Sequence, residues 1–202
     1  FMPKVFAEHP GSGMHTHMSL FEGDTNAFHE PGAPYQLSKT GRQFIAGLLH
    51  HGSEISAVTN QWVNSYKRLV PGYEAPTAIA WSERNRSPLI RVPAARGSMT
   101  RIELRMPDPS CNPYLALAVM LRAGLDGIER KLDPGPPVEG NGYAATPAST
   151  AGAPALPATW HESLERARAS AFLREGLGEG FLKVFLAIKQ QELARFEAEV
   201  TE

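Results

Sequence analysis

The run of residues 100–106 restricts the fold of this chain more than any other segment. Every second position is apolar, namely Ile102, Leu104 and Met106. The positions between them are charged, namely Arg101, Glu103 and Arg105. Successive side chains of a strand point to opposite faces, so the run predicts a strand with one core face and one charged face. Same-face neighbours lie about 7 Å apart, so the three charged groups share one space.

Other segments supply the rest of the expected fold. Short runs with strand character occur at residues 14–20, 77–81 and 89–92. Apolar residues recur at helical spacing in segments 38–58, 112–132, about 160–171 and about 179–198. Together they predict an α+β fold, in which an antiparallel sheet with one charged active-site face is backed by helices.

The later helices carry more specific expectations. The helix at residues 112–132 is apolar on nearly every side and has Pro113 in its first turn, so we expect it to be buried beneath the charged sheet. The last helix has an apolar stripe, namely Phe181, Val184, Phe185, Ile188 and Phe196. Residues 133–158 are rich in Pro, Gly, Ala and Ser, and they predict a long loop within the domain.

Composition excludes several classes of function. The 202 residues carry a net charge of −1, so no global field attracts nucleic acid or another long polyanion. No apolar run reaches the roughly 18 residues that span a bilayer and no signal peptide opens the chain, so we expect a cytoplasmic protein without a membrane partner. The one cysteine, Cys111, rules out an intrachain disulfide and is expected to be a small buried side chain.

The charged face of the predicted strand has two interpretations. In the first, Arg101, Glu103 and Arg105 form a salt-bridge ladder on a sheet, where exposed pairs contribute little to stability. In the second, Glu103 is an oxygen ligand of Mg²⁺ or Mn²⁺, while the arginines hold carboxylate or phosphate oxygens. The strand pattern alone leaves both open.

The segment Gly11-Ser-Gly-Met-His15 favours the second interpretation. Its small residues let backbone amides approach an anion, and its imidazole can bind a metal ion. Strand alternation also places His15, His17 and Ser19 on one face. The remaining histidines have no comparable setting and are expected at the surface or as satisfied core residues: His9, His29, His50, His51 and His161.

Arginines are concentrated in one part of this nearly neutral chain. Those within residues 68–105 include Arg68, Arg84, Arg86, Arg91, Arg101 and Arg105. Segment 64–76 is bent by Pro71 and Gly72 and contains Arg68 and Glu74, a combination that predicts a lid over an anionic substrate. Glu74 is either placed to act on what the lid covers or is an exposed loop carboxylate.

In their order along the chain, these motifs resemble the C-terminal part of the catalytic domain of the glutamine synthetase family. The resemblance covers most of residues 1–202. The matching runs are Gly11-Ser-Gly-Met-His15, Asn64-Ser-Tyr-Lys-Arg-Leu-Val-Pro-Gly-Tyr-Glu-Ala-Pro76, Arg84-Asn-Arg-Ser87, Ile90-Arg-Val-Pro93, Arg101-Ile-Glu-Leu-Arg105, Pro107-Asp-Pro109, Asn112-Pro-Tyr114 and Ala123-Gly-Leu-Asp-Gly-Ile128.

The resemblance implies an ATP-dependent ligase that joins glutamate and ammonia through a γ-glutamyl phosphate, with Mg²⁺ or Mn²⁺. It implies that His15 and Glu103 bind metal and that Gly11, Arg68 and Arg105 hold glutamate. The residues it assigns to the nucleotide are His17, Ser19, Arg86, Arg91 and Arg101. The residues it assigns to catalysis are Glu74 and Arg86, with Glu74 closing over glutamate and helping to deprotonate ammonium.

The resemblance also carries departures from the family pattern. Pro10 stands where the family usually has asparagine, and it offers neither an amide side chain nor a backbone N–H. A γ-glutamyl amide ligase that uses a polyamine or another amine is therefore the nearest alternative. Tyr143 lies near the position of a tyrosine that some bacterial members adenylylate, but its flanking residues differ and we expect an ordinary surface residue.

The family pattern implies a larger assembly as well. It places most metal-binding glutamates and a small domain ahead of Phe1, and it places each active site between subunits of a homo-oligomer. This chain alone is then expected to hold only part of a site. Two other classes of function stay open: a catalytically silent module of the same fold and a guanidino-kinase-like phosphotransferase.

Overall fold

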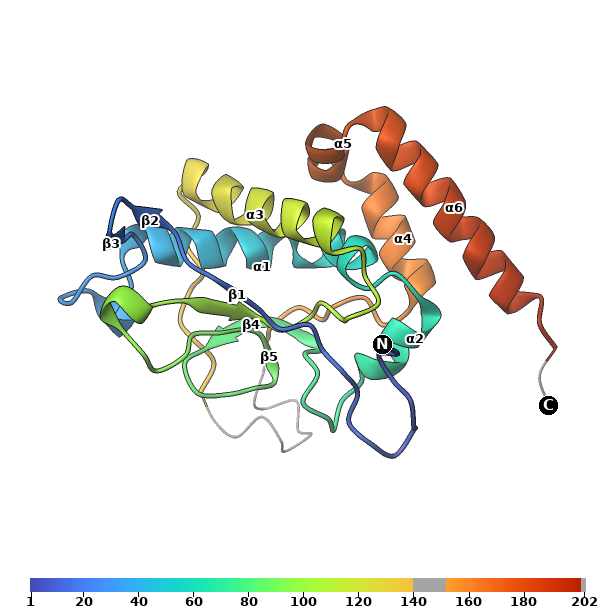
Figure 1. Cartoon of the computed structure of the whole chain (residues 1–202), viewed down its shortest axis with the longest axis horizontal. Coiled ribbons are helices and arrows are strands. Elements are labelled where there is room, and N and C mark those ends of the chain that lie inside the picture. The colour runs from blue at the N-terminus through green and yellow to red at the C-terminus, as the bar shows by residue number, and fades with distance from the viewer. Residues whose placement is uncertain (140–151, 201–202) are drawn as a thin grey trace.

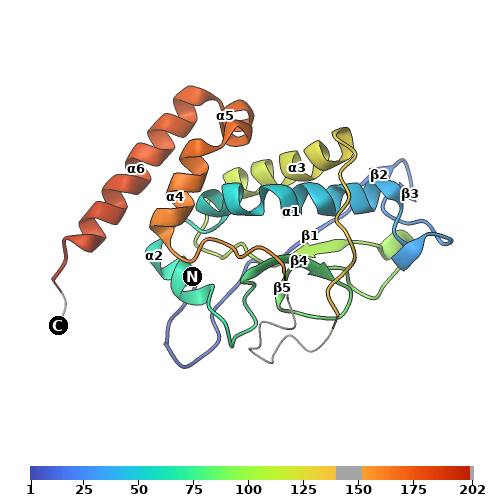
Figure 2. The ribbon, with the colours of Figure 1, turned by 180° about the vertical axis from the view of Figure 1, so that it is seen from behind.

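Two helical layers cover one face of a four-stranded sheet. The computed structural model describes residues 1–139 and 152–200. Helix α1 (Lys39–Thr59) lies directly on the sheet, and α3 (Pro113–Glu129) packs on the outer side of α1 (Figures 1 and 2). The predicted α+β class is confirmed. None of the described helices is both long and apolar enough to cross a membrane.

The sheet combines antiparallel and parallel pairings. Its strands follow the order β1 (Thr16–Met18), β6 (Ile102–Leu104), β5 (Pro88–Arg91) and β4 (Ala78–Ser82). The predicted antiparallel arrangement is found for β1 with β6 and for β6 with β5. The pair of β5 and β4 is parallel instead, because residues 83–87 run back along the sheet before β5 begins.

The alternation of residues 102–106 separates two environments, as predicted. Ile102, Leu104 and Met106 are fully buried in the hydrophobic core. Glu103 and Arg105 point to the other face, but each is only 2% exposed. The charged face is therefore covered at these two positions, where neighbouring polar groups replace water.

Helices α1 and α3 approach each other closely. A side chain at Gly47 would meet the backbone nitrogen of Gly127 at 2.7 Å and would also contact the carbonyl oxygen of Ala123. Each helix begins at a side-chain cap: the Ser38 hydroxyl accepts from Gly41 N at 3.0 Å, and the Asn112 side chain accepts from the first turn of α3. The glycine contact explains why these helices pack backbone against backbone.

The prediction that the helix at 112–132 is buried beneath the sheet is wrong. The inner side of α3, including Ala116, Met120 and Ala123, packs on α1 rather than on the strands. Its outer side exposes Leu117 and Leu121 at 50% and 46%. An apolar sequence on all sides of a helix does not predict which sides pack against another part of this chain.

The C-terminal helices form a group at one end of the molecule: α4 (Trp160–Ala169), α5 (Ala171–Leu177) and α6 (Glu179–Glu197) (Figure 1). Of the apolar stripe predicted for the last helix, only Phe185 is buried, and the exposed members are Phe181, Val184, Ile188 and Phe196. The buried face instead contains Leu182, Leu186 and Leu193. Helix α6 is therefore apolar on two sides, of which one is packed.

Short elements complete the chain: β2 (Phe21–Glu22), β3 (Thr25–Asn26), α2 (Val63–Arg68) and the 3₁₀ turns Pro34–Gln36 and Gly97–Met99. In the predicted loop 133–158, the described residues contain no helix or strand, and Ala155 makes a single bridge to Ala78. Tyr143 lies outside the described residues. Cys111 is buried as predicted, and burial raises the pKa of its thiol to about 11.

Candidate active site

The strand directions bring four candidate residues to one end of the sheet. Glu74 precedes β4 and Arg86 precedes β5, and the parallel pairing puts the starts of these two strands side by side. Arg105 reaches the same end because β6, which it follows, is antiparallel to β5. His15 reaches it because β1, which it precedes, is antiparallel to β6. The parallel pair thus joins the lid to the charged strand.

Polar residues also line up across the strands. Glu103 on β6 is in register with His17 on β1 and with Arg91 on β5, and Arg91 is in register with Ser82 on β4. Cross-strand neighbours in register lie close enough for direct contact. The charged face is therefore a continuous polar row with one carboxylate at its centre.

Glu103 is held by cations on both sides. Its Oε2 accepts a 2.5 Å hydrogen bond from Arg91 Nε, and its Oε1 accepts a 2.5 Å hydrogen bond from Arg105 Nη1. His15 Nδ1 lies 3.1 Å from the same Oε1. Burial raises the pKa of Glu103, but the hydrogen bond to His15 and the charges of Arg105 and Arg91 outweigh burial and lower the pKa to about 2. Glu103 is therefore an anion at neutral pH.

Arg105 connects this carboxylate to the lid. Its Nε donates to the Arg86 carbonyl oxygen at 2.9 Å, and its Nη2 donates to the Glu74 carbonyl oxygen at 3.2 Å. With the bond to Glu103, the guanidinium of Arg105 has a partner in three directions. The side chain therefore fixes the backbone of two loops relative to the buried carboxylate.

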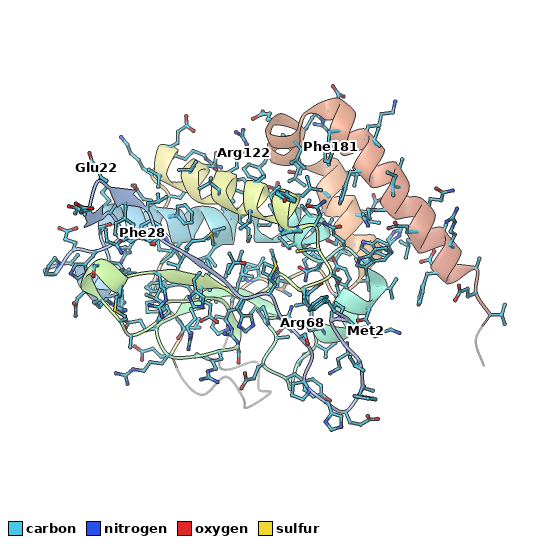
Figure 3. The ribbon with its side chains drawn as sticks, in the orientation of Figure 1. Met2, Glu22, Phe28, Arg68, Arg122 and Phe181 are labelled. Carbon is cyan, nitrogen blue, oxygen red and sulfur yellow. The ribbon has the colours of Figure 1, made fainter. Side chains whose placement is uncertain are left out.

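The Arg68 side chain forms its hydrogen bonds with backbone carbonyl oxygens. It is 3% exposed, and its guanidinium donates to the carbonyl oxygens of Met106 at 2.8 Å and Arg105 at 2.9 Å. Burial lowers the pKa of Arg68 to about 10, so it stays charged at neutral pH. Figure 3 shows Arg68 on the sheet side of the molecule, away from Arg122 and Phe181 on the outer helices. Its role toward glutamate stays a prediction, and its visible role is to brace the strand end.

The glycines of residues 11–13 permit a close approach, but the groups approached belong to the protein itself, namely the Pro3 carbonyl oxygen and the side chains of Arg68 and His15. A Cβ atom at Gly11 would lie 2.9 Å from Arg68 Cγ, and one at Gly13 would lie 2.7 Å from His15 Nε2. The Gly13 Cβ would also contact the Arg68 guanidinium. Packing on Arg68 thus requires these glycines, and the predicted contact of Gly11 with substrate remains untested.

The lid residues lie at the surface. Glu74 Oε1 is 3.6 Å from Arg86 Nη1, and these side chains are 48% and 53% exposed. An exposed pair at this distance contributes little to stability. The two predicted catalytic side chains are therefore adjacent, and both are about half exposed.

Two of the predicted nucleotide residues, His17 and Arg101, meet where β1 pairs with β6. Arg101 Nε donates to His17 Nδ1 at 3.2 Å. Burial lowers the pKa of His17, and the charge of Arg101 lowers it further, so the imidazole is neutral and can accept this bond. Ser19 lies just beyond β1 with an exposed side chain, so the predicted alternation of His15, His17 and Ser19 is confirmed.

Comparisons with known proteins match this geometry to one family. The family model described as "Glutamine synthetase, catalytic domain" matches residues 1–202. The chain belongs to the glutamine synthetase family. It is 58% identical to glutamine synthetase of Thermus thermophilus over 194 residues, which is 95% of this chain and 44% of that protein. It is 53% identical to glutamine synthetase of Mycolicibacterium smegmatis over 206 residues, which is 100% of this chain and 46% of that protein.

Solved structures agree with this assignment. A structure titled "GmaS/ADP complex-Conformation 1" superimposes with a TM-score of 0.88 at 37% identity, and it covers 100% of this chain and 47% of that one. The ligand-free structure titled "Apo GmaS without ligand" gives the same TM-score. This chain thus spans less than half the length of the glutamine synthetases it matches.

Members of the glutamine synthetase family use ATP with a divalent metal ion, and the geometry around Glu103 fits two ligands of such an ion. An anionic carboxylate and an imidazole meet at 3.1 Å, which are donor types that Mg²⁺ or Mn²⁺ accepts. Within residues 1–139 and 152–200, no cluster of three or more His, Cys, Asp or Glu side chains is present. The described part of the chain therefore offers an incomplete ligand set.

Two buried polar residues near the predicted site were not indicated by the sequence patterns. Asn60 is fully buried, and its Nδ2 donates to Met106 O at 2.8 Å and to Asp108 Oδ2 at 2.9 Å, behind the strand end that Arg68 also holds. Lys4 is 6% exposed and lies against the lid. A polar residue directly after an apolar helix period was the available signal for Asn60, whereas no pattern marks Lys4.

Proposed function

We propose that the protein to which this chain belongs forms glutamine from glutamate and ammonia, using ATP and a γ-glutamyl phosphate intermediate. The observation that carries the proposal is the Glu103 cluster, in which a buried carboxylate is held by Arg91 and Arg105 beside His15. A salt-bridge ladder of exposed pairs would not require this burial. The 58% identity to a protein named glutamine synthetase supports the same reading.

His15 and Glu103 are the proposed metal ligands in this chain. A bound Mg²⁺ or Mn²⁺ would neutralise charge on the transferred phosphoryl group. Arg86, Arg91 and Arg101 lie along the polar row and its lid, where their guanidinium groups can bind phosphate oxygens. His17 and Ser19 are proposed to lie near the nucleotide. Pre-arranged cations of this kind stabilise developing negative charge without reorganisation.

The amino-acid substrate is proposed to bind between the lid and the strand end. Gly11, Arg68 and Arg105 are the proposed contacts for glutamate, with Arg68 acting mainly by holding the backbone of residues 105–107. Glu74 would take a proton from ammonium, and its half-exposed carboxylate lies beside Arg86 at the surface of the site. Closing the lid would shield the acyl phosphate from water.

The site is proposed to be shared. Residues 1–202 would form the C-terminal portion of the catalytic domain, with the loop 133–158 inside it, and neighbouring subunits of a homo-oligomer would complete each site. Support comes from the incomplete metal set among the described residues and from the length of the relatives.

The test is glutamine formation by the full-length protein with ATP, glutamate, ammonium and Mg²⁺ or Mn²⁺. We expect glutamine and phosphate in equal amounts, and loss of both on chelation of the metal. A full-length protein that binds ADP with metal but forms no amide with any amine would instead indicate a catalytically silent module.

A γ-glutamyl amide ligase is the second candidate, and Pro10 is the observation that favours it. Proline removes a backbone donor and an amide side chain directly before Gly11, where the substrate loop begins. Competition between ammonium and small primary amines or diamines distinguishes the candidates. Preference for ammonium supports glutamine synthesis, and a Pro10→Asn variant is expected to leave that preference unchanged.

A further inference from the structure

Residues 3–12 form a compact loop next to the lid. Ser12 N donates to the Pro3 carbonyl oxygen at 2.8 Å, so the ends of the loop lie together. Gly11 passes directly over the same carbonyl oxygen. Loops with adjoining ends and internal packing behave as small rigid units. Gly11 lies at the end of the 3–12 loop. A contact made elsewhere on this loop can therefore affect the position of Gly11 in the proposed glutamate site.

Lys4 is the centre of this loop. Its backbone N and O are both bonded to the side chain of Asn64 on α2, each at 2.8 Å. Its ammonium donates to the His9 carbonyl oxygen at 2.5 Å and lies 3.5 Å from the centre of the Tyr73 ring. A cation over an aromatic face is attracted most strongly when it is shielded from water, and Lys4 is 6% exposed.

Tyr73 belongs to the lid and directly precedes Glu74. Its hydroxyl donates to the Ala7 carbonyl oxygen at 2.8 Å, so both its ring and its hydroxyl are bound by the 3–12 loop. On the other side, Arg105 holds the Glu74 carbonyl oxygen. Two adjacent lid residues are thus anchored to two different parts of the site.

We propose that Lys4 and Tyr73 form a latch that holds the lid closed and keeps Glu74 over the reacting groups. This inference rests on the proposed function. Lys4 and Tyr73 act as positioning residues, because the latch reaches the reacting groups through Glu74 and Gly11. A closed lid excludes water from the acyl phosphate.

Opening the latch has a defined chemical consequence. A water oxygen would bond to the carbonyl carbon of γ-glutamyl phosphate, and the bond from that carbon to the phosphate oxygen would break. The products are glutamate and inorganic phosphate, with ADP already formed in the preceding transfer from ATP. This hydrolysis, called the leak below, is therefore detected as phosphate released without glutamine.

The experiment measures the leak ratio of the full-length protein, which is the phosphate released in excess of glutamine divided by the glutamine formed. Lys4→Met removes the ammonium from the Tyr73 ring at similar length, and we expect this ratio to rise about tenfold, which corresponds to ~1.4 kcal/mol of lost cation–π attraction. Lys4→Arg keeps a cation that stacks on aromatic rings and is expected to restore most of the coupling.

Tyr73→Leu and Lys189→Met complete the design. Tyr73→Leu opens the latch from the lid side, where the folded core is not touched, and its effect should not add to that of Lys4→Met. Lys189 is also buried, with its ammonium 4.3 Å from the Trp62 ring centre, but it lies on α6 and packs on Trp62 rather than on the Tyr73 ring. Lys189→Met should leave the ratio at the wild-type value.

The outcomes separate the latch from the proposed function. A wild-type protein that forms glutamine, with unchanged ratios in both Lys4→Met and Tyr73→Leu, overturns the latch. Equal leaks in Lys4→Met and Lys189→Met overturn it too, because loss of any buried cation would then suffice. A wild-type protein that forms no amide contradicts the proposed function instead.

Discussion

Two buried charge clusters of this chain are built differently. On the sheet, Glu103 lies between Arg91 and Arg105, with 2.5 Å hydrogen bonds to both. Between the helices, His51 is 4% exposed, with Nδ1 2.6 Å from Glu54 and Nε2 2.8 Å from Asp126. The first cluster faces the lid, whereas the second joins α1 to α3.

The two clusters differ in their net charge. In the helix cluster, both ring nitrogens of His51 face carboxylates, so the imidazole is protonated, and Arg130 adds a second cation 3.1 Å from Asp126. Two cations and two anions then cancel. In the sheet cluster, one carboxylate faces two arginines, so positive charge is left over.

The difference in net charge indicates which cluster is suited to bind a ligand. A balanced cluster is complete within the folded chain, and its role is to hold elements together. Surplus positive charge is costly by itself, and an anion such as a phosphate would neutralise it. Both clusters have a buried central residue, whereas the surplus of arginine charge belongs to the sheet cluster and is consistent with the anionic ligand proposed for it.

The largest expected effect comes from removing the central carboxylate. Glu103→Ala leaves the buried guanidinium of Arg105 and the partly buried one of Arg91 without their carboxylate, which costs about 3–5 kcal/mol in the free energy of unfolding, and it removes a proposed metal ligand. We expect loss of glutamine formation and of stability together in the full-length protein. Glu165→Ala removes an exposed partner of Arg168 at 3.7 Å and is the control, expected to change neither. Wild-type stability in Glu103→Ala would contradict the comparison.

The helix cluster should affect stability without chemistry. His51→Phe keeps a ring beside Phe172, whose centre lies 3.7 Å away, but removes one donor from Glu54 and one from Asp126, which keeps its bond to Arg130. We expect a loss of about 1–3 kcal/mol in denaturant unfolding, since unsatisfied polar groups are desolvated. Activity per folded molecule should stay within about twofold of wild type, which corresponds to ~0.4 kcal/mol. A selective loss of turnover would place His51 in the reaction.

The same histidine makes stability depend on pH. Burial lowers the pKa of His51, but the hydrogen bonds and charges of Glu54 and Asp126 outweigh burial and raise it above 6.5. A raised pKa stabilises the fold below the unfolded value, and this contribution is lost as pH rises through the folded value. The free energy of unfolding should therefore fall with rising pH from 6.5 upward, and His51→Phe should lack that component.

The smallest effect on stability is expected at the lid. Arg86→Met removes a half-exposed partner of Glu74, so the free energy of unfolding should change by less than about 0.5 kcal/mol. Glutamine formation should nevertheless decrease strongly, because Arg86 is a proposed contact for the phosphates. Full activity in this variant would remove Arg86 from the proposed site while leaving the Glu103 cluster intact.

Local patterns in the sequence predicted much of this structure. The alternation of residues 102–106 predicted the strand and both of its faces, and the spacing of Phe44, Ile45 and Leu48 predicted the helix over the sheet. Both features depend on periods of 2 and 3.6 residues, which a sequence states directly. The grouping of His15 with Glu103 came from the family resemblance.

Other features depend on residues that are distant in the sequence, so local patterns could not predict them. The parallel pairing of β4 and β5 follows from the return of residues 83–87, and no periodicity expresses it. Arg68 was predicted to hold a ligand, but whether a guanidinium meets a ligand or carbonyl oxygens depends on where residues 105–107 lie. Apolar faces of α3 and α6 likewise reveal hydrophobicity but not the presence of a covering partner.

The parallel pair turns residues 83–87 into a ruler. This segment must run from the end of β4 back to the start of β5, a distance of roughly 11 Å, because Ser82 is in register with Arg91 and three residue steps of β5 separate Arg91 from Pro88. Its six Cα–Cα steps can cover about 20 Å, and three steps would cover only about 10 Å. Surface loops usually accept changes in length, but a deletion of three residues here would leave the segment too short to keep this pairing. The length of this loop therefore sets both the register of the parallel strands and the place of Arg86 beside Glu74.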